Sequence, residues 1–506
     1  MKKLFSSVSL LNNVCLSKNV NFVNNDKIVV DANLEDVCEF YQRELNRYVD
    51  KNLFFTRSPL AVAVGLCIAQ KNLASRFNKF EINIVSHNNI CIINDLSYGK
   101  NFEALKFAVQ IKLDNLVVVC AKCDERLFNY FEKIGVKVAS QGEVDFYDTS
   151  GITLVRLEDF FDAKEEDLNR LFKISYQKAI IFGASRERNY KIDSAKFKKN
   201  FYDEYKLYKD FYEKEPTLSM DSREQISGID LGNVALNKIS SDLLNVVGGT
   251  PNLIDRTHAF IVGGGEFPSN PIGTNINFVG FEDIMYEVCA GMSLHGGLNV
   301  FCADLLSRSY KLFGLDISFK GLFIFLEDDY DYLSLLRMDK RITTFNAGNA
   351  SEIAFAFEYA FNTHMPTALV LTKELLSGSV ASKDEIKKGA YIISDEKYPN
   401  AVLLASGKDV NLALEVKLIL KPKGIDLIVI SVPCTNLLDD NLKIVNRFKM
   451  KSIFAFDRAD TSYLERYIPK TGEVINVENE TNENLAKKIY FLIKRNGERT
   501  DSLFDE

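Results

Sequence analysis

The chain has 506 residues, of which 46% are hydrophobic, and it carries a formal net charge of −7 with a pI near 5.5. This length predicts about two to four domains with ordinary large cores. The acidic balance argues against nucleic acid as the main partner, and no apolar run is as long as a membrane span, so no membrane partner is expected.

The cysteines and the N-terminal segment bear on the cellular compartment. Nine cysteines are scattered, mostly in apolar runs, which is typical of reduced, buried thiols in a cytoplasmic protein. Cys120 and Cys123 have CxxC spacing, but no second pair completes a zinc site, so we interpret them as packed thiols and predict no metal site. Residues 1–19 could pass for a weak signal peptide, but polar residues interrupt their apolar part, so we interpret them as ordinary structure.

The first 205 residues alternate short apolar runs with amphipathic segments. Apolar runs at residues 82–93, 113–121 and 178–185 predict strands, and residues 102–113 between the first two predict a helix. This alternation is the βαβ rhythm of a parallel sheet.

Two more α/β units follow in the chain. Residues 197–215 are charged, aromatic and free of glycine, so they predict a connecting helix that stops near Pro216. A second unit extends to about residue 380, and a third starts near Tyr398 and ends with a helix at residues 484–497. We therefore expect three domains, at residues 1–205, 206–380 and 381–506.

Residues 277–297 read NFVGFEDIMYEVCAGMSLHGG and say more than any other stretch. A short apolar strand (residues 278–279) runs into Gly280, and Glu282 follows. Apolar residues then recur at helical spacing until two glycines end the helix. Glu282 thus lies at a strand-to-helix junction, where an open α/β sheet holds its ligands. The alternative is a first-turn glutamate favoured only by the helix dipole.

Several ordered segments resemble the transketolase family. The helix ending LHGG at residues 294–297 matches the end of the helix behind the family's Gly-x-x-Glu-like turn, and PTALVLTKELL at residues 366–376 is similar to the last strand of the pyrimidine-binding domain. The runs at residues 402–416 and 429–440, the second with a VPCT turn, resemble the opening of the family's C-terminal domain. LHGG and VPCT fit transketolase better than the related deoxyxylulose-phosphate synthase.

The resemblance implies an architecture and an assembly. It implies three consecutive doubly wound α/β domains of transketolase type: a shortened diphosphate-binding-like domain, a pyrimidine-binding-like domain and a C-terminal-like domain. The family builds its sites across a two-fold interface, so a homodimer is expected.

The resemblance also implies roles for two residues. The family binds thiamine diphosphate between subunits, through Mg²⁺ or Ca²⁺ on the diphosphate side. A glutamate there protonates the pyrimidine ring, and Glu282 matches this glutamate. Lys373 replaces the family's arginine at a strand end, where a lysine can still meet a substrate phosphate; the alternative is a surface lysine.

Other family motifs are missing. Leu305 and Arg308 stand where aromatic residues stack on the pyrimidine, and the loop that carries a sugar-binding histidine is deleted. Asp95 has lost the two glycines of the family's Gly-Asp-Gly, and the strand end with Cys120 and Cys123 has lost the metal-binding Asn. Asp95 and Asp124 alone would hold a hard cation weakly.

Two functions are carried forward. The first is a transketolase-like protein degenerate in cofactor and sugar-phosphate binding, with no cofactor, that acts as a non-catalytic dimer or binds a protein partner. The alternative is a thiamine-diphosphate-dependent transketolase that moves a two-carbon ketol unit between sugar phosphates, alone or with a partner chain.

Overall fold

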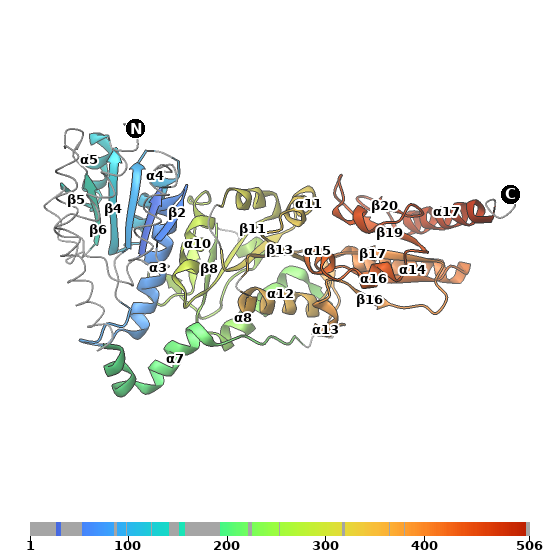
Figure 1. Ribbon diagram of the computed structural model, residues 1–506, viewed down its shortest axis with the longest axis horizontal. Coiled ribbons are helices and arrows are strands. Elements are labelled where there is room, and N and C mark those ends of the chain that lie inside the picture. Colours follow the sequence, from blue (N-terminus) through green and yellow to red (C-terminus); the bar gives the residue numbers. More distant parts are fainter. Residues whose placement is uncertain are drawn as a thin grey trace, which may run out of the picture.

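The computed structural model describes residues 27–31, 53–85, 89–97, 99–122, 124–140, 151–156, 193–220, 225–251, 254–315, 319–363, 365–378 and 380–501. Within these ranges, three large β-sheets with helices packed on them follow one another along the chain and along the long axis of the molecule (Figure 1). The fold is mixed α/β with parallel sheets, as predicted. No helix in the described ranges is long and apolar enough to cross a bilayer.

The first unit is built on a six-stranded parallel sheet with strand order β2-β1-β3-β4-β6-β5. Of the segment expected to be a strand at residues 82–93, only the second half forms one, as part of β3. The strand expected at residues 178–185 lies outside the described residues. Its elements are β1 (Lys27–Asp31), β2 (Leu53–Thr56), α3 (Pro59–Phe77), β3 (Asn89–Asp95), α4 (Asn101–Gln110), β4 (Asn115–Lys122), α5 (Glu125–Lys133), β5 (Lys137–Ser140) and β6 (Gly151–Arg156).

The middle unit contains a seven-stranded parallel sheet with strand order β13-β14-β12-β11-β8-β10-β9. The first and last strands of this unit, β7 and β15, form a separate two-stranded antiparallel sheet. Its elements are β7 (Ile226–Ser227), α8 (Gly228–Asp242), β8 (Val246–Thr250), α9 (Ile254–Thr257), β9 (Glu266–Phe267), β10 (Asn275–Asn277), α10 (Met285–His295), β11 (Asn299–Leu305), η2 (Leu306–Gly314), β12 (Gly321–Leu326), α11 (Asp331–Met338), β13 (Thr343–Asn346), α12 (Ala350–Thr363), β14 (Thr367–Leu371) and β15 (Leu375–Leu376).

The third unit is a five-stranded sheet with strand order β16-β18-β17-β19-β20, in which only β16 runs antiparallel to its neighbour. Its elements are α13 (Lys383–Ile386), β16 (Tyr391–Ser394), β17 (Ala401–Ala405), α14 (Asp409–Leu420), η3 (Lys421–Lys423), β18 (Leu427–Ser431), α15 (Thr435–Asp439), α16 (Lys443–Asn446), β19 (Ser452–Asp457), η4 (Tyr463–Tyr467), β20 (Glu473–Asn476) and α17 (Asn482–Asp501). The domain boundaries expected at residues 205 and 380 stay a prediction.

The first and middle units share one hydrophobic core because α3 packs directly on α10. The two helices meet through glycines: a Cβ on Gly65 would lie 2.0 Å from the Val288 carbonyl oxygen, and one on Gly291 would lie 2.1 Å from the Val62 carbonyl oxygen. Any side chain at either glycine would push the helices apart, so this close backbone approach requires both residues.

The predicted connecting helix is α7 (Tyr202–Glu213), which ends shortly before Pro216. It crosses α3 through aromatic contacts, because the Phe77 ring lies 5.0 Å from the Phe211 ring and 5.1 Å from the Tyr208 ring in edge-on geometry. The side chain of Asn245, which directly precedes β8, donates a 3.0 Å hydrogen bond to the Phe211 carbonyl oxygen. The connection is therefore fastened to both units that it joins.

A fully buried carboxylate joins the middle unit to the third. Glu352 on α12 accepts hydrogen bonds from the Tyr391 hydroxyl (2.7 Å) on β16 and the Ser431 hydroxyl (2.6 Å) on β18. Burial raises the pKa of Glu352 above its usual range, while these hydrogen bonds and one from the Gly348 N–H act to lower it. A buried carboxylate with several donors fixes the relative position of the two units.

We predict that Gly65→Ala destabilises the protein by about 2 kcal/mol or more, because overpacking the α3–α10 contact outweighs the helix propensity that alanine adds. The measurement is the free energy of unfolding in urea. Gly314→Ala is the control, because a Cβ there meets nothing within 4 Å, and it should stay within about 0.5 kcal/mol of the parent. Equal stability of both variants would contradict the packing described here.

Candidate functional site

Glu282 lies in the loop between β10 and α10, and its side chain is half-buried. The strand expected at residues 278–279 lies earlier in the chain, because β10 ends at Asn277. The residues that follow form a turn in which Gly280 has φ +77°. A carboxylate oxygen of Glu282 accepts a 3.1 Å hydrogen bond from the Gly280 N–H. The carboxylate thus closes its own turn.

Aromatic residues of the first and middle units pack together at the loop that contains Glu282. Phe278 stacks on Phe107 of α4 with 5.2 Å between ring centroids, and Phe281 lies 4.9 Å from the same ring. All three rings are buried. The position of Glu282 therefore depends on α4 of the first unit as well as on its own sheet.

Lys311, on the 3-10 helix η2, bonds to the same loop. The Lys311 ammonium on η2 lies 2.8 Å from an Asp283 carboxylate oxygen and 3.3 Å from the Glu282 carbonyl oxygen. The hydrogen bond from Lys311 holds the pKa of Asp283 below its usual range. This contact leaves the Lys311 side chain only 12% exposed, so the lysine serves the loop itself.

Asp304 is the last residue but one of strand β11 and is fully buried. Its carboxylate accepts hydrogen bonds from the Tyr286 hydroxyl (2.9 Å) and the Leu305 N–H (2.8 Å) and lies 3.4 Å from the Arg308 guanidinium. Burial raises the pKa of Asp304, and it also raises the pKa of Tyr286 well above its usual range. Leu305 is buried and Arg308 is bonded to Asp304, so neither of these two positions offers a flat ring wall.

A second buried carboxylate, Glu287 on α10, faces the first unit. One of its oxygens bonds to the Lys100 ammonium, while the other is buried without a hydrogen-bond partner. Burial raises the pKa of Glu287, and the charge of Lys100 acts against that rise. Lys100 directly precedes α4, so this ion pair ties the loop after β3 to α10.

The acidic residues expected near a metal are occupied locally. One carboxylate oxygen of Asp95 accepts hydrogen bonds from the N–H (2.8 Å) and the hydroxyl (2.7 Å) of Ser97. Asp124 caps α5 by accepting a 2.8 Å hydrogen bond from the Arg126 N–H. Among the described residues, no group of three or more His, Cys, Asp or Glu side chains could hold a metal ion, and Cys123 lies outside those residues.

Lys373 is exposed and follows strand β14, two residues after its end. Glu282 follows β10, and β12, β11 and β8 lie between these two strands in the sheet. With strands about 4.8 Å apart, the two strand ends are separated by roughly 19 Å. Both residues lie at the carboxyl edge of one sheet, but the structure does not bring them together within the chain.

Sequence reasoning missed the buried pairs around Glu282. The Glu287–Lys100 pair joins residues far apart in sequence, and no local pattern links them. Asp304 had a visible signal, because it is an acid at the end of the apolar run NVFCADL.

Comparisons with known proteins follow the same order of units. A model of the transketolase thiamine diphosphate binding domain matches residues 57–124, and a model of the transketolase-like C-terminal domain matches residues 389–497. These matches at both ends of the three-unit fold place the chain in the class of proteins built on the thiamine diphosphate-binding α/β architecture. The chain belongs to the transketolase family.

Individual relatives and structures agree with this. The transketolase of Geobacillus stearothermophilus is 24% identical over an alignment covering 83% of this chain and 77% of the relative. The transketolase of Aquifex aeolicus is 23% identical over 85% of this chain and 75% of the relative. The transketolase structure from Leishmania mexicana superposes with a TM-score of 0.81 at 15% identity, covering 98% of this chain and 96% of the other. At this identity the superposition shows the fold alone.

The comparisons support a thiamine diphosphate cofactor, whereas the side chains of the described residues do not. The matched domain model and the relatives' names support thiamine diphosphate, so they do not bear out the expectation of no cofactor, and they agree with the transketolase alternative. The described residues, however, do not fit a diphosphate held through a divalent metal. Asp95 accepts its hydrogen bonds from Ser97 and Asp124 accepts one from Arg126, so each is bonded within its own turn.

We predict that Lys100→Met destabilises the protein by about 3 kcal/mol near neutral pH, because it leaves the buried Glu287 carboxylate without its counter-charge. Since burial raises the pKa of Glu287 in the folded state, the folded state takes up the proton more readily than the unfolded chain. The loss should therefore be larger at about pH 8 than at about pH 5, because the raised pKa of Glu287 lets it take up a proton more readily as the pH falls.

Urea unfolding at both pH values measures this effect. Lys106→Met in helix α4 is the control, because Lys106 pairs with the half-exposed Glu103 and otherwise contacts the rings of Phe102 and Phe281, so its loss leaves no buried carboxylate without a counter-charge. The double variant Lys100→Met/Glu287→Met should recover most of the stability. A loss that is independent of pH, or equal in the control, would contradict the assignment.

Proposed function

We propose that this chain keeps the transketolase architecture but does not transfer ketol units by itself, and that it acts as a dimeric or partner-binding protein. One observation carries this proposal: the charged side chains around the expected site are bonded to one another or to their own turns. Glu282 bonds to Gly280, Asp95 to Ser97 and Arg308 to Asp304. These contacts take up part of the hydrogen-bonding capacity that a cofactor and a substrate would use.

The second candidate is a thiamine-diphosphate-dependent transketolase that moves a two-carbon ketol unit between sugar phosphates, alone or with a partner chain. The match to the thiamine diphosphate binding domain model and the names of the relatives favour it over the first candidate. Glu282 and Lys373 are its candidate residues for the pyrimidine and a substrate phosphate. A partner chain would have to supply the oxygen ligands that Asp95 and Asp124 do not offer.

Calorimetry with thiamine diphosphate and Mg²⁺ or Ca²⁺ distinguishes the two candidates. We predict no metal-dependent dissociation constant of about 1 μM or tighter, which corresponds to about −8 kcal/mol. A transketolase from one of the relatives, titrated in the same buffer, is the positive control. Metal-dependent binding in the micromolar range would overturn the first candidate and favour the second.

The Glu282→Gln variant tests whether Glu282 itself is a catalytic residue. We predict no ketol transfer from xylulose 5-phosphate by the parent chain, and a free energy of unfolding within about 1 kcal/mol of the parent for Glu282→Gln. The amide oxygen of glutamine can still accept the Gly280 N–H that Glu282 now accepts. Transfer by the parent that disappears in Glu282→Gln would establish the enzyme instead.

We also propose a homodimer, which rests on the resemblance to the family. The apolar residues of α10 are buried under α3 within one chain, so they do not argue for contact with a second copy. Light scattering should give twice the 57.3 kDa mass of the chain. A single-chain mass at high protein concentration would refute the dimer. A cytoplasmic location also stays a prediction.

A further inference from the structure

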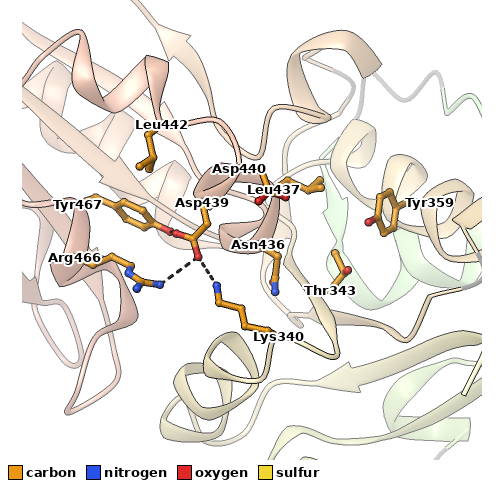
Figure 2. A pocket seen from close by; sticks show the side chains of 10 residues that line it. All are labelled: Lys340, Thr343, Tyr359, Asn436, Leu437, Asp439, Asp440, Leu442, Arg466 and Tyr467. Carbon is orange, nitrogen blue, oxygen red and sulfur yellow. Dashed lines mark hydrogen bonds and ion pairs between the residues drawn. The ribbon is translucent and has the colours of Figure 1, made fainter. Parts of the chain in front are cut away.

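A pocket of about 640 Å³ lies between the middle and third units (Figure 2). The middle unit contributes Lys340, Thr343 at the start of β13, and Tyr359 on α12. The third unit contributes α15, the loop after it and the end of η4. A volume of this size is within the range of pockets that hold small molecules, about 300–1,000 Å³.

The pocket lies at the edge of the third sheet where parallel strands end. Helix α15 follows β18 and η4 follows β19, and these two strands flank β17 on opposite sides. The chain passes from β17 to one neighbour and then crosses to the other, so the strand order changes direction here. Open α/β sheets hold ligands beyond the carboxyl ends of strands near such a point.

One carboxylate organises the charged wall. Asp439 accepts hydrogen bonds from Lys340, from the Tyr463 hydroxyl (3.0 Å), from Arg466 (3.2 Å) and from the Tyr467 hydroxyl (2.7 Å), and Figure 2 shows Lys340 and Arg466 converging on it. Burial tends to raise the pKa of Asp439, but the hydrogen bonds from Lys340 and the two tyrosines outweigh it, so the net pKa is lowered. Asp439 is therefore ionised and holds two cations side by side.

Both cations keep hydrogen-bonding capacity for a further group. The side chains of Lys340 and Arg466 remain 57% and 48% exposed. Their hydrogen bonds to Asp439 and Tyr463 use two of the ammonium donors and one nitrogen of the guanidinium. A guanidinium beside an ammonium is the donor set that phosphate prefers.

The rest of the pocket suits a hydroxylated body. Asp440 is exposed at the rim and can accept hydrogen bonds from hydroxyl groups. Tyr359, Leu437 and Leu442 provide apolar surface for carbon-bound hydrogens. Asp439 and Asp440 together balance the charges of Lys340 and Arg466, so a polyanion would be repelled at the acidic side while a ligand with one anionic end fits.

We propose that this pocket binds a small polyol phosphate, with its phosphate on Lys340 and Arg466 and its hydroxyl groups toward Asp440. The binding site is separate from the loop of Glu282 and does not require ketol transfer. Because its walls come from two units, an occupied pocket would also tie α15 and η4 to Lys340 and the edge strand β13.

Glucitol 6-phosphate is a suitable probe, because it has no carbonyl group and so cannot take part in ketol transfer. The chain contains no tryptophan, so Leu442→Trp places a single indole at the pocket rim, and its emission reports occupancy there. Calorimetry on the parent chain gives the dissociation constant without any substitution. Glucitol and inorganic phosphate, titrated separately, test the two halves of the ligand.

We expect glucitol 6-phosphate to bind at millimolar or lower concentration and to change the indole emission, with each half binding at least about tenfold more weakly. Arg466→Gln should weaken binding about tenfold, since one charge-assisted contact is lost. Arg495→Gln is the matched control: Arg495 is a similarly exposed arginine of the same unit, paired with Glu473, outside the residues that line the pocket. It should leave binding unchanged.

Three results would overturn the proposal: no binding of glucitol 6-phosphate, equal binding of inorganic phosphate alone, or equal loss in Arg466→Gln and Arg495→Gln. If Arg466→Gln does not fold, Lys340→Gln, which removes the neighbouring cation, provides the same test, with Lys387→Gln on an exposed turn as its control. None of these outcomes depends on thiamine diphosphate, so this proposal and the proposed function fail or succeed separately.

Discussion

The contact between α3 and α10 is the constraint on which most of the molecule depends. Gly65 and Gly291 let two helices from different units meet at backbone distance, and the residues around them form one continuous core. Dispersion and burial at such a contact are large because no side chain separates the helices. The loop of Glu282 leads directly into α10, so its position is set by this contact and by the Phe107 ring beneath it.

The third unit is attached by a different kind of interaction. Its sheet has apolar layers of its own on both faces. Apolar packing on the middle unit comes from Cys434 and Leu437, and buried polar groups add to it. Glu352 bridges to Tyr391 and Ser431, and the buried Arg337 donates a 2.7 Å hydrogen bond to the Ser406 hydroxyl near the Asp457 carboxylate. Buried polar contacts of this kind specify one geometry more than they add stability.

Local features were predictable from the sequence, and features assembled from distant segments were not. The helix before Gly296 follows from apolar spacing and a C-terminal glycine, both of which are visible in a short window. The contact between Gly65 and Gly291 could not be predicted, because no local sequence pattern links these two distant segments. The pocket around Asp439 was missed for the same reason, since its donors come from residues 340 and 463–467. The separation of Glu282 from Lys373 depends on strand order, which the sequence does not reveal.

The shared core makes the first two units a single cooperative body. Opening α3 exposes the apolar side of α10 at the same time, so backbone amides of both units should exchange with solvent together, through the same global event. The third unit can open while keeping its own layers intact, because it loses only its contacts with the middle unit. A protease that samples such partial openings would therefore cut first between β15 and α13, and release a C-terminal fragment that is still folded.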